Sequence, residues 1–201
     1  MNDQGGGTVA TNGIYCLEGE WDADLRKRQS VQPVLQMLES LGMIKFIHRD
    51  VATREELEHY LARWERSTYD DYQVLYLATH GDRSTISWSS HNSMTLDGLA
   101  DALGDTAQGC YVYLGGCSVL ASEEDASRFV RKTGAAALCG YRKDVDWIEG
   151  AAFELIMLDA LANHTGRPKT LFISLMKRHS QLAALYEFVL VTKAEVFSSK
   201  K

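Results

Sequence analysis

The feature that most constrains the fold is a repeated alternation of short apolar runs with longer stretches of helical periodicity. The apolar runs are four or five residues long and cover residues 14–17, 44–47, 74–78, 110–114, 135–139 and 188–191, with Lys45 as their one charged residue. Successive side chains of a strand point to opposite faces, so an uninterrupted apolar run predicts a strand that is buried on both faces. Such strands are typical of parallel sheets covered by helices.

Stretches of helical periodicity separate these runs. In one of them, Thr53 and Glu56 have the spacing of a capping box, and Gly42 and Gly134 follow two others as stop signals. We expect helices over residues 26–41, 53–64, 96–103, 124–133, 151–161 and 170–185, with residues 86–88 as one arm of a hairpin. The alternation predicts an α/β fold, in which a mostly parallel six-stranded sheet carries helices on both faces.

Composition narrows the class of protein and its partners. The chain of 201 residues is 45% hydrophobic and 24% charged, as expected for a globular domain with a core. Its formal net charge of −6 provides no positive field for a phosphate backbone, so we expect no nucleic-acid partner. No apolar run approaches the ~20 residues that span a bilayer, and residues 1–13 lack the regions of a signal peptide, so we expect a cytoplasmic protein without a membrane partner.

The chain shows no internal linker or repeat, which predicts one domain. Residues 1–13 are rich in Gly, Thr and Asn and are expected to form a flexible tail. The domain is expected to cover residues 14–197, and residues 198–201 are expected to form a C-terminal tail.

Four cysteines, at positions 16, 110, 117 and 139, are too few for a disulfide scaffold and have no CxxC spacing. We expect reduced thiols. Cys16, Cys110 and Cys139 fall in apolar runs, where a small buried hydrophobe is expected, whereas Cys117 follows a run. No histidine has a partner at metal-ligand spacing, and the glycines before Cys117 lack the pattern of a phosphate-binding loop, so neither a metal nor a cofactor is predicted.

A possible catalytic pair stands at the ends of two runs. In open parallel sheets, ligands bind beyond the carboxyl ends of the strands. His80 follows the run 74–78 and Cys117 follows the run 110–114. If those strands are neighbours, about 5 Å apart, the two side chains share one edge of the sheet. A thiolate attacks a carbonyl carbon while an imidazole accepts the thiol proton and protonates the leaving amine, so the pair predicts covalent acyl transfer.

Glycines flank both residues of this pair. Gly81 follows the histidine, and Gly115 and Gly116 precede the cysteine. Glycine allows tight turns and close approach of a peptide, and its backbone N–H groups can face a developing oxyanion.

An apolar strand ending in His80-Gly81, followed by a second ending in Gly116-Cys117, resembles the caspase-like cysteine peptidases. This group contains the caspases, the metacaspases, separase and the bacterial CHAT domains. Within the group, the sequence resembles the CHAT domains more than the caspases. The resemblance runs from about Ile14 to the last strand. The separation of 37 residues is shorter than the ~50 of caspases. The caspase signature Gln-Ala-Cys-x-Gly is absent, so specificity for aspartate is not transferred.

The resemblance implies a three-layer caspase-like sandwich and a cysteine endopeptidase that cleaves a protein or peptide substrate through a thioester. It implies that Cys117 is the nucleophile, that His80 is base and acid, and that the backbone N–H groups of Gly81 and Cys117 form the oxyanion hole. Small bacterial relatives are often regulated effectors of stress or antiviral defence. Activation by a partner, by self-cleavage, by a metal or by a nucleotide signal stays open.

The resemblance also places a substrate pocket after the first strand, before the nucleophile and after the next strand. The residues assigned to substrate binding are Glu18, Glu20, Asp22, Gly116, Asp144 and Asp146. Their carboxylates would favour Arg or Lys before the cut through charge-assisted hydrogen bonds. The alternative interpretation, which we weigh equally, is that these carboxylates form ordinary ion pairs at the protein surface. Glu149 and Glu154, further along, are expected on an exposed helix face.

Two other functions stay open at this point. A non-catalytic caspase-like module could bind a partner or a nucleotide signal at the same cleft. A flavodoxin-like ligand binder is the third hypothesis. Trp147 is interpreted either as a packing residue or as a wall of a substrate groove.

Overall fold

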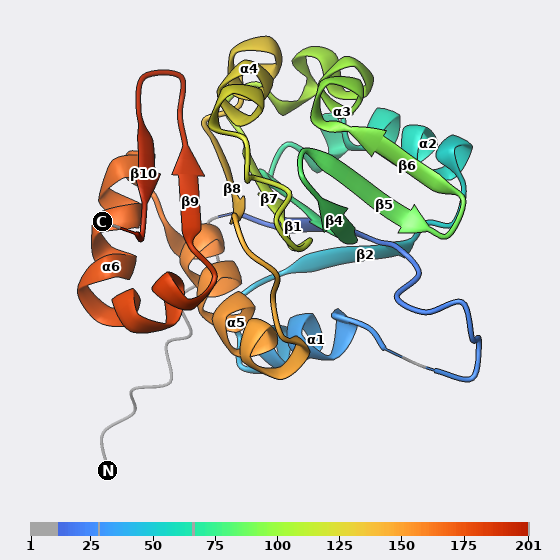
Figure 1. The fold of residues 1–201 in the computed structure, drawn as a ribbon, viewed down its shortest axis with the longest axis horizontal. Coiled ribbons are helices and arrows are strands. Elements are labelled where there is room, and N and C mark those ends of the chain that lie inside the picture. Colours follow the sequence, from blue (N-terminus) through green and yellow to red (C-terminus); the bar gives the residue numbers. More distant parts are fainter. Residues whose placement is uncertain (1–11, 28, 66, 201) are drawn as a thin grey trace.

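A seven-stranded sheet forms the centre of the computed structural model, which describes residues 12–27, 29–65 and 67–200 (Figure 1). The strand order is β10-β9-β8-β7-β3-β1-β2. The strands of this sheet are β1 (Ile14–Glu18), β2 (Phe46–Asp50), β3 (Val74–Ala78), β7 (Tyr111–Leu114), β8 (Ala137–Tyr141), β9 (Phe188–Val191) and β10 (Val196–Ser198). The five adjacent strands β2, β1, β3, β7 and β8 run parallel. The next strand, β9, pairs antiparallel with β8, and β10 pairs antiparallel with β9.

The expected six strands are therefore all present, but the count of six is wrong. The seventh strand, β10, has three residues that are only half-buried. A strand this short at the edge of a sheet has no apolar run to mark it. The mostly parallel α/β architecture is confirmed.

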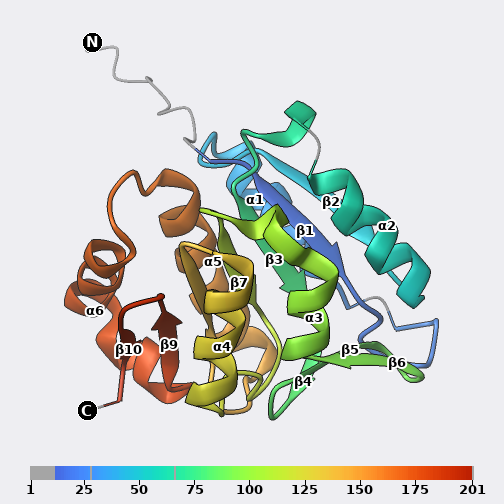
Figure 2. The ribbon, with the colours of Figure 1, turned by 90° about the horizontal axis from the view of Figure 1, so that it is seen from above.

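Six α-helices lie within the described residues. They are α1 (Gln32–Ser40), α2 (Arg54–Trp64), α3 (Leu96–Leu103), α4 (Glu123–Thr133), α5 (Trp147–Asn163) and α6 (Pro168–Leu185). Figure 2 shows α1, α5 and α6 on one face of the sheet and α2, α3 and α4 on the other. Strand side chains alternate accordingly. In β3, Tyr76 belongs to the core cluster under α5, and its neighbours Leu75 and Leu77 belong to the cluster under α2 and α3.

Local signals explain where several helices begin and end. The capping box of Thr53 and Glu56 is present at the start of α2. Gly134 ends α4 with a φ of +67°, a left-handed conformation that favours glycine. Two helix starts differ from expectation by four residues or more. The helix α1 begins at Gln32, with Pro33 in its first turn, and α5 begins four residues early because Asp146 caps it.

A small antiparallel sheet follows β3 directly. It consists of β4 (His80–Asp82), β5 (Thr85–Ser89) and β6 (Asn92–Thr95), in that order. The expected hairpin arm at residues 86–88 is the middle strand of this sheet. Its short, polar neighbours β4 and β6 gave no strand signal.

The packed part of the chain extends beyond the expected domain limits. Asn12 and Gly13 are buried, and the backbone N–H of Asn12 donates to the carbonyl of Ala162 (2.8 Å). Ser198 belongs to β10, and Lys200 forms an ion pair with Glu187 (2.8 Å). The rest of the expected N-terminal tail, residues 1–11, lies outside the described residues. Among the helices of the described chain, none combines the length and the apolar character that crossing a membrane requires.

Candidate active site

The strands that carry His80 and Cys117 are direct neighbours. In the parallel pair β3 and β7, Leu77 lies opposite Leu114. His80 and Cys117 each come three residues after these partners, so they leave the sheet at the same edge and at equivalent positions. The condition on which the candidate pair depends, that the two strands are neighbours, is therefore met.

Two glycines allow the loops after these strands to touch. A Cβ atom added to Gly81 would lie 2.6 Å from the carbonyl oxygen of Cys117 and 2.0 Å from Val119 Cγ2. A Cβ added to Gly116 would lie 2.8 Å from the carbonyl oxygen of Thr79 and 3.0 Å from the Gly81 nitrogen. Side chains at these positions would force the loops apart, so glycine sets the spacing between the histidine and cysteine segments.

His80 and Cys117 line one cavity of about 290 Å³ at this edge of the sheet. Cys117 is half-buried and His80 is exposed. The other residues of the cavity come from the segment after β1, from the start of α1, from the loop after β8 and from α5. The two candidate catalytic side chains thus face a common, open space.

The Cys117 sulfur lies on a tight turn. Its Sγ atom accepts a hydrogen bond from the backbone N–H of Val145 (3.3 Å) and lies 3.9 Å from the carbonyl oxygen of the same residue, so the backbone of Val145 holds the sulfur in place. The next residue, Ser118, has a φ of +46°, and its N–H donates to the Lys143 carbonyl (3.0 Å). A left-handed serine is strained by about 1–3 kcal/mol, and strain of this kind clusters at functional sites.

The His80 ring is oriented by Trp21. Its Nε2 atom lies 3.0 Å from the Trp21 carbonyl oxygen. A carbonyl oxygen only accepts, so Nε2 carries the proton and Nδ1 is left with the lone pair that a base needs. The Trp21 ring packs edge-on against His80 (centroids 5.2 Å apart) and against Trp147 (4.9 Å). Trp147 therefore forms part of the cavity wall, which agrees with the second of the two interpretations given to it from the sequence.

Glu18 holds the Trp21 segment in place. The buried carboxylate accepts hydrogen bonds from Trp21 Nε1 (2.5 Å), Ser30 Oγ (2.7 Å) and the Val31 N–H (2.7 Å), and it pairs with His48 Nε2 (2.6 Å). Burial alone would raise the pKa of Glu18, but these hydrogen bonds outweigh it and lower the pKa below its usual value. Asp50 lies beside this pair. The ligand atoms of Glu18, His48 and Asp50 lie within 4.8 Å of one another, as in a metal site. The four hydrogen bonds to Glu18 already occupy both of its oxygens, so we assign this carboxylate the role of a tether.

The acids expected in the substrate pocket have different positions. Glu18 does not line the cavity, and Glu20 and Asp22 line adjoining hollows beside Trp21. Asp146 lines the cavity, but one of its oxygens caps α5 by accepting from the N–H groups of Ile148 (2.9 Å) and Glu149 (3.2 Å).

The two other expected pocket residues do not line the cavity either. Asp144 is exposed and lies outside it. Gly116 is buried between the two loops, where it sets their spacing.

The carboxyl group that sequence reasoning missed is Glu154. It is 7% exposed and lines the cavity, so its assignment to an exposed face is wrong. Burial raises the pKa of this carboxyl to about 8. A signal was available, because Glu154 falls within the helical stripe of Gly150, Phe153, Met157 and Leu158, all of them buried.

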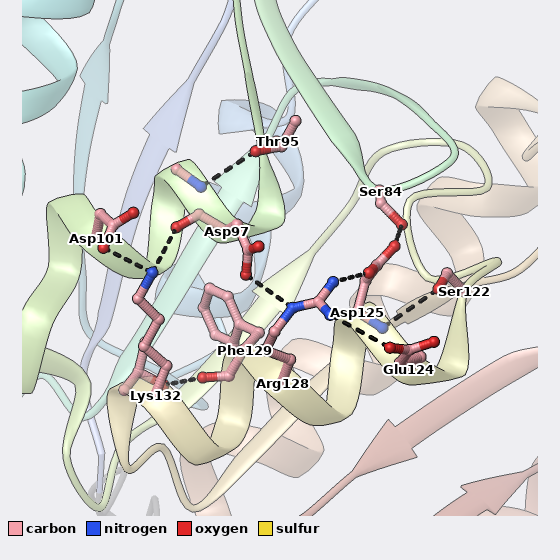
Figure 3. A network of polar contacts seen from close by, with 12 residues as sticks. Ser84, Thr95, Asp97, Asp101, Ser122, Glu124, Asp125, Arg128, Phe129 and Lys132 are labelled. Atoms are coloured by element: carbon pink, nitrogen blue, oxygen red, sulfur yellow. Dashed lines mark hydrogen bonds and ion pairs between the residues drawn. The ribbon is translucent and has the colours of Figure 1, made fainter.

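A polar network anchors the turn that follows His80 and Gly81 (Figure 3). Ser84 Oγ donates to Asp125 Oδ2 (2.7 Å) at the start of α4, and the Ser84 N–H donates to the Val119 carbonyl (3.0 Å). Arg128 bonds both Asp125 and Asp97, thereby joining α4 to α3. The histidine loop is thus tied to the helix that follows the cysteine loop.

All four cysteines are free thiols, as expected. Cys16 and Cys139 are buried in β1 and β8, and Cys110 is half-buried beside β7. Burial raises the pKa of Cys110 to about 11, which makes it a poor nucleophile at neutral pH.

Comparison with known families gives one match. Residues 11–191 match the model of DUF6642, described as a family of unknown function, and the chain belongs to this family. No curated protein matches the chain.

Proposed function

We propose that this chain is a cysteine endopeptidase of the caspase-like type, with Cys117 as nucleophile and His80 as base and acid. The observation that carries the proposal is that both side chains line one cavity, at equivalent positions on adjacent parallel strands. The half-buried sulfur with one N–H donor and the fixed histidine tautomer add to it.

The fold supports the same proposal in outline. Helices pack on both faces of a mostly parallel sheet, and we take this arrangement as a three-layer caspase-like sandwich. The histidine loop continues into a small separate sheet, and Ser87 and Ser89 of this sheet line a second hollow that shares Trp21 and His80 with the cavity.

The proposed reaction has two steps. His80 Nδ1 takes the Cys117 proton, and the sulfur attacks the substrate carbonyl carbon to form a tetrahedral oxyanion. The N–H groups of Gly81 and Cys117 stabilise this anion. The C–N bond then breaks, and the imidazolium gives its proton to the leaving amine, which leaves a thioester. Water, deprotonated by His80, attacks the thioester, and the acid product and the thiol are released.

A peptide library tests the proposal. The intact protein is incubated with a mixture of peptides, and new termini are identified by mass spectrometry. We expect cleavage by the wild type, and we expect it to be lost in Cys117→Ala and in His80→Ala. Cys110→Ala is the matched control and should cleave like the wild type. Cleavage that survives in Cys117→Ala contradicts the proposal. Complete absence of cleavage, with no acceleration of Cys117 alkylation by His80, favours a non-catalytic binding module.

A further inference from the structure

Glu154 is a buried acid that no cation neutralises among the described residues. It lies in the second turn of α5 and is 7% exposed. The side chains that act on its charge are Tyr76 and Glu18, and neither of them is a cation. A hydrogen bond with Tyr76 lowers the pKa of Glu154 in part, but it supplies no positive charge. A buried acid without a cation beside it is costly, and such a group either stays protonated or receives its counter-charge from a ligand.

The carboxyl group faces the segment that carries the nucleophile. A Cβ atom added to Gly115, two residues before Cys117, would lie 2.8 Å from Glu154 Oε1 and 3.1 Å from Tyr76 Oη. Gly115 therefore leaves the space that this carboxyl group occupies. Glu154, Gly115 and Cys117 all line the same cavity.

A second buried polar group in the cavity lacks a partner. Thr79, the residue before His80, is 2% exposed and lines the cavity. Its hydroxyl oxygen has no hydrogen-bond partner among the described residues. Buried hydroxyls are ordinarily paired, so this unpaired hydroxyl beside His80 marks a polar part of the cavity wall that the described residues do not satisfy.

The walls of the cavity suit an aliphatic chain. They include Val31, Val34 and Val145 together with the rings of Trp21 and Trp147. A volume of about 290 Å³ is at the lower end of the ligand-pocket range of about 300–1,000 Å³, so the cavity has room for one side chain. A lysine or arginine side chain combines an apolar stem with a cationic head.

From these contacts we infer that Glu154 is the specificity-determining residue of this cavity and that it binds the cationic head of a substrate lysine or arginine. The inference rests on the proposed function and deepens it by naming the substrate class. Among the acids expected in the pocket, only Asp146 shares this cavity, and it is engaged in capping α5.

Binding of a cation by Glu154 should release a proton. Without a ligand, burial raises the pKa of Glu154 to about 8, so most of the carboxyl is protonated at pH 7. Burial also raises the pKa of Tyr76, Tyr113, Tyr141 and Cys16, which stay neutral, while Glu18 keeps its charge. The other ionisable residues of the cavity are His80, Cys117 and Asp146.

The first experiment does not depend on cleavage. N-butylguanidine and its neutral analogue N-butylurea are tested as protectants of Cys117 against iodoacetamide, with the modified residue identified by mass spectrometry. We expect N-butylguanidine to protect the wild type at concentrations at least tenfold lower than N-butylurea. Glu154→Gln should abolish this preference, and Glu149→Gln, an exposed position on the same helix, should keep it. Equal protection by the two compounds, or an unchanged preference in Glu154→Gln, overturns the inference.

A second measurement tests whether binding of the cation releases a proton from Glu154. Calorimetric titration with N-butylguanidine at pH 7, in two buffers of different ionisation enthalpy, should show release of nearly one proton by the wild type and none by Glu154→Gln. Equal proton release by both proteins contradicts the role of Glu154.

Peptide cleavage then separates this inference from the proposed function. Cleavage only after acidic or apolar residues refutes the inference and keeps the peptidase. Selective protection by N-butylguanidine, with no cleavage of any peptide and no acceleration of Cys117 alkylation by His80, keeps the cation site and refutes the peptidase.

Discussion

Replacing Glu154 by glutamine should stabilise the fold at neutral pH. The carboxyl ordinarily titrates near 4.5, and burial raises its pKa to about 8. Between these values the folded chain holds a proton that the unfolded chain has released. Each pH unit above 4.5 therefore lowers the free energy of unfolding by about 1.4 kcal/mol, which gives about 3 kcal/mol at pH 7. Glutamine has a similar shape and does not titrate, so the variant escapes this loss.

Urea or thermal unfolding between pH 5 and pH 8 measures the effect. For a chain of this size, about 3 kcal/mol corresponds to a Tm difference of about 6–12 °C at pH 7. The difference should shrink towards pH 5, where the wild type loses little stability. Glu39→Gln, at an exposed position of α1, is the control and should follow the wild type at every pH. Parallel curves for the wild type and Glu154→Gln would show that Glu154 is ionised and solvated, and would refute the reasoning.

Two further predictions concern the construction of the site. Glu18→Gln leaves buried donors unpaired and should lower the free energy of unfolding by about 3 kcal/mol in urea titrations at pH 7. Wild-type Glu18 stabilises the fold above its ordinary pKa, because its pKa is lower in the folded chain. This stabilisation disappears as the pH falls through the lowered pKa, so the difference between the variant and the wild type should diminish in acid. A loss that does not depend on pH contradicts this assignment. Gly81→Ala should destabilise the fold by about 1–3 kcal/mol, because its Cβ would meet Cys117 and Val119. Gly98 lies in α3, and a Cβ added there would lie 3.6 Å from Met94 and Thr95, which is ordinary contact, so Gly98→Ala should instead stabilise the helix by about 0.5–1 kcal/mol. Similar unfolding midpoints for the two variants would be inconsistent with the contact between the loops.

The sequence predicts the central strands well because both of their faces are buried. The expected bounds of 74–78 and 188–191 are those of β3 and β9. Edge and rim strands such as β4 and β10 are short and half exposed, so no run of apolar residues marks them. The predicted start of α1, at residue 26, is too early. Periodicity alone does not show that Glu18 binds Ser30 and Val31 and so holds them outside the helix.

The candidate site shows the same division between local and long-range information. The shared edge of His80 and Cys117 follows from strand order and position, which the sequence pattern encodes. The contact between His80 and Trp21 joins residues 59 positions apart, and no local pattern predicts it. The predicted exposure of Glu154 is wrong because a carboxyl group ordinarily lies at the surface, whereas Glu154 falls within an apolar helical stripe that faces the core.

The most direct test of the central claim is the rate at which iodoacetamide modifies Cys117 in the native protein at pH 7. We expect Cys117 to react faster in the folded wild type than in the urea-unfolded chain, and we expect His80→Ala to lose this acceleration, since the imidazole takes the thiol proton. Cys110 should react more slowly when folded, because burial raises its pKa. A folded Cys117 that reacts no faster than the unfolded one, or that is unaffected by His80→Ala, would contradict the account.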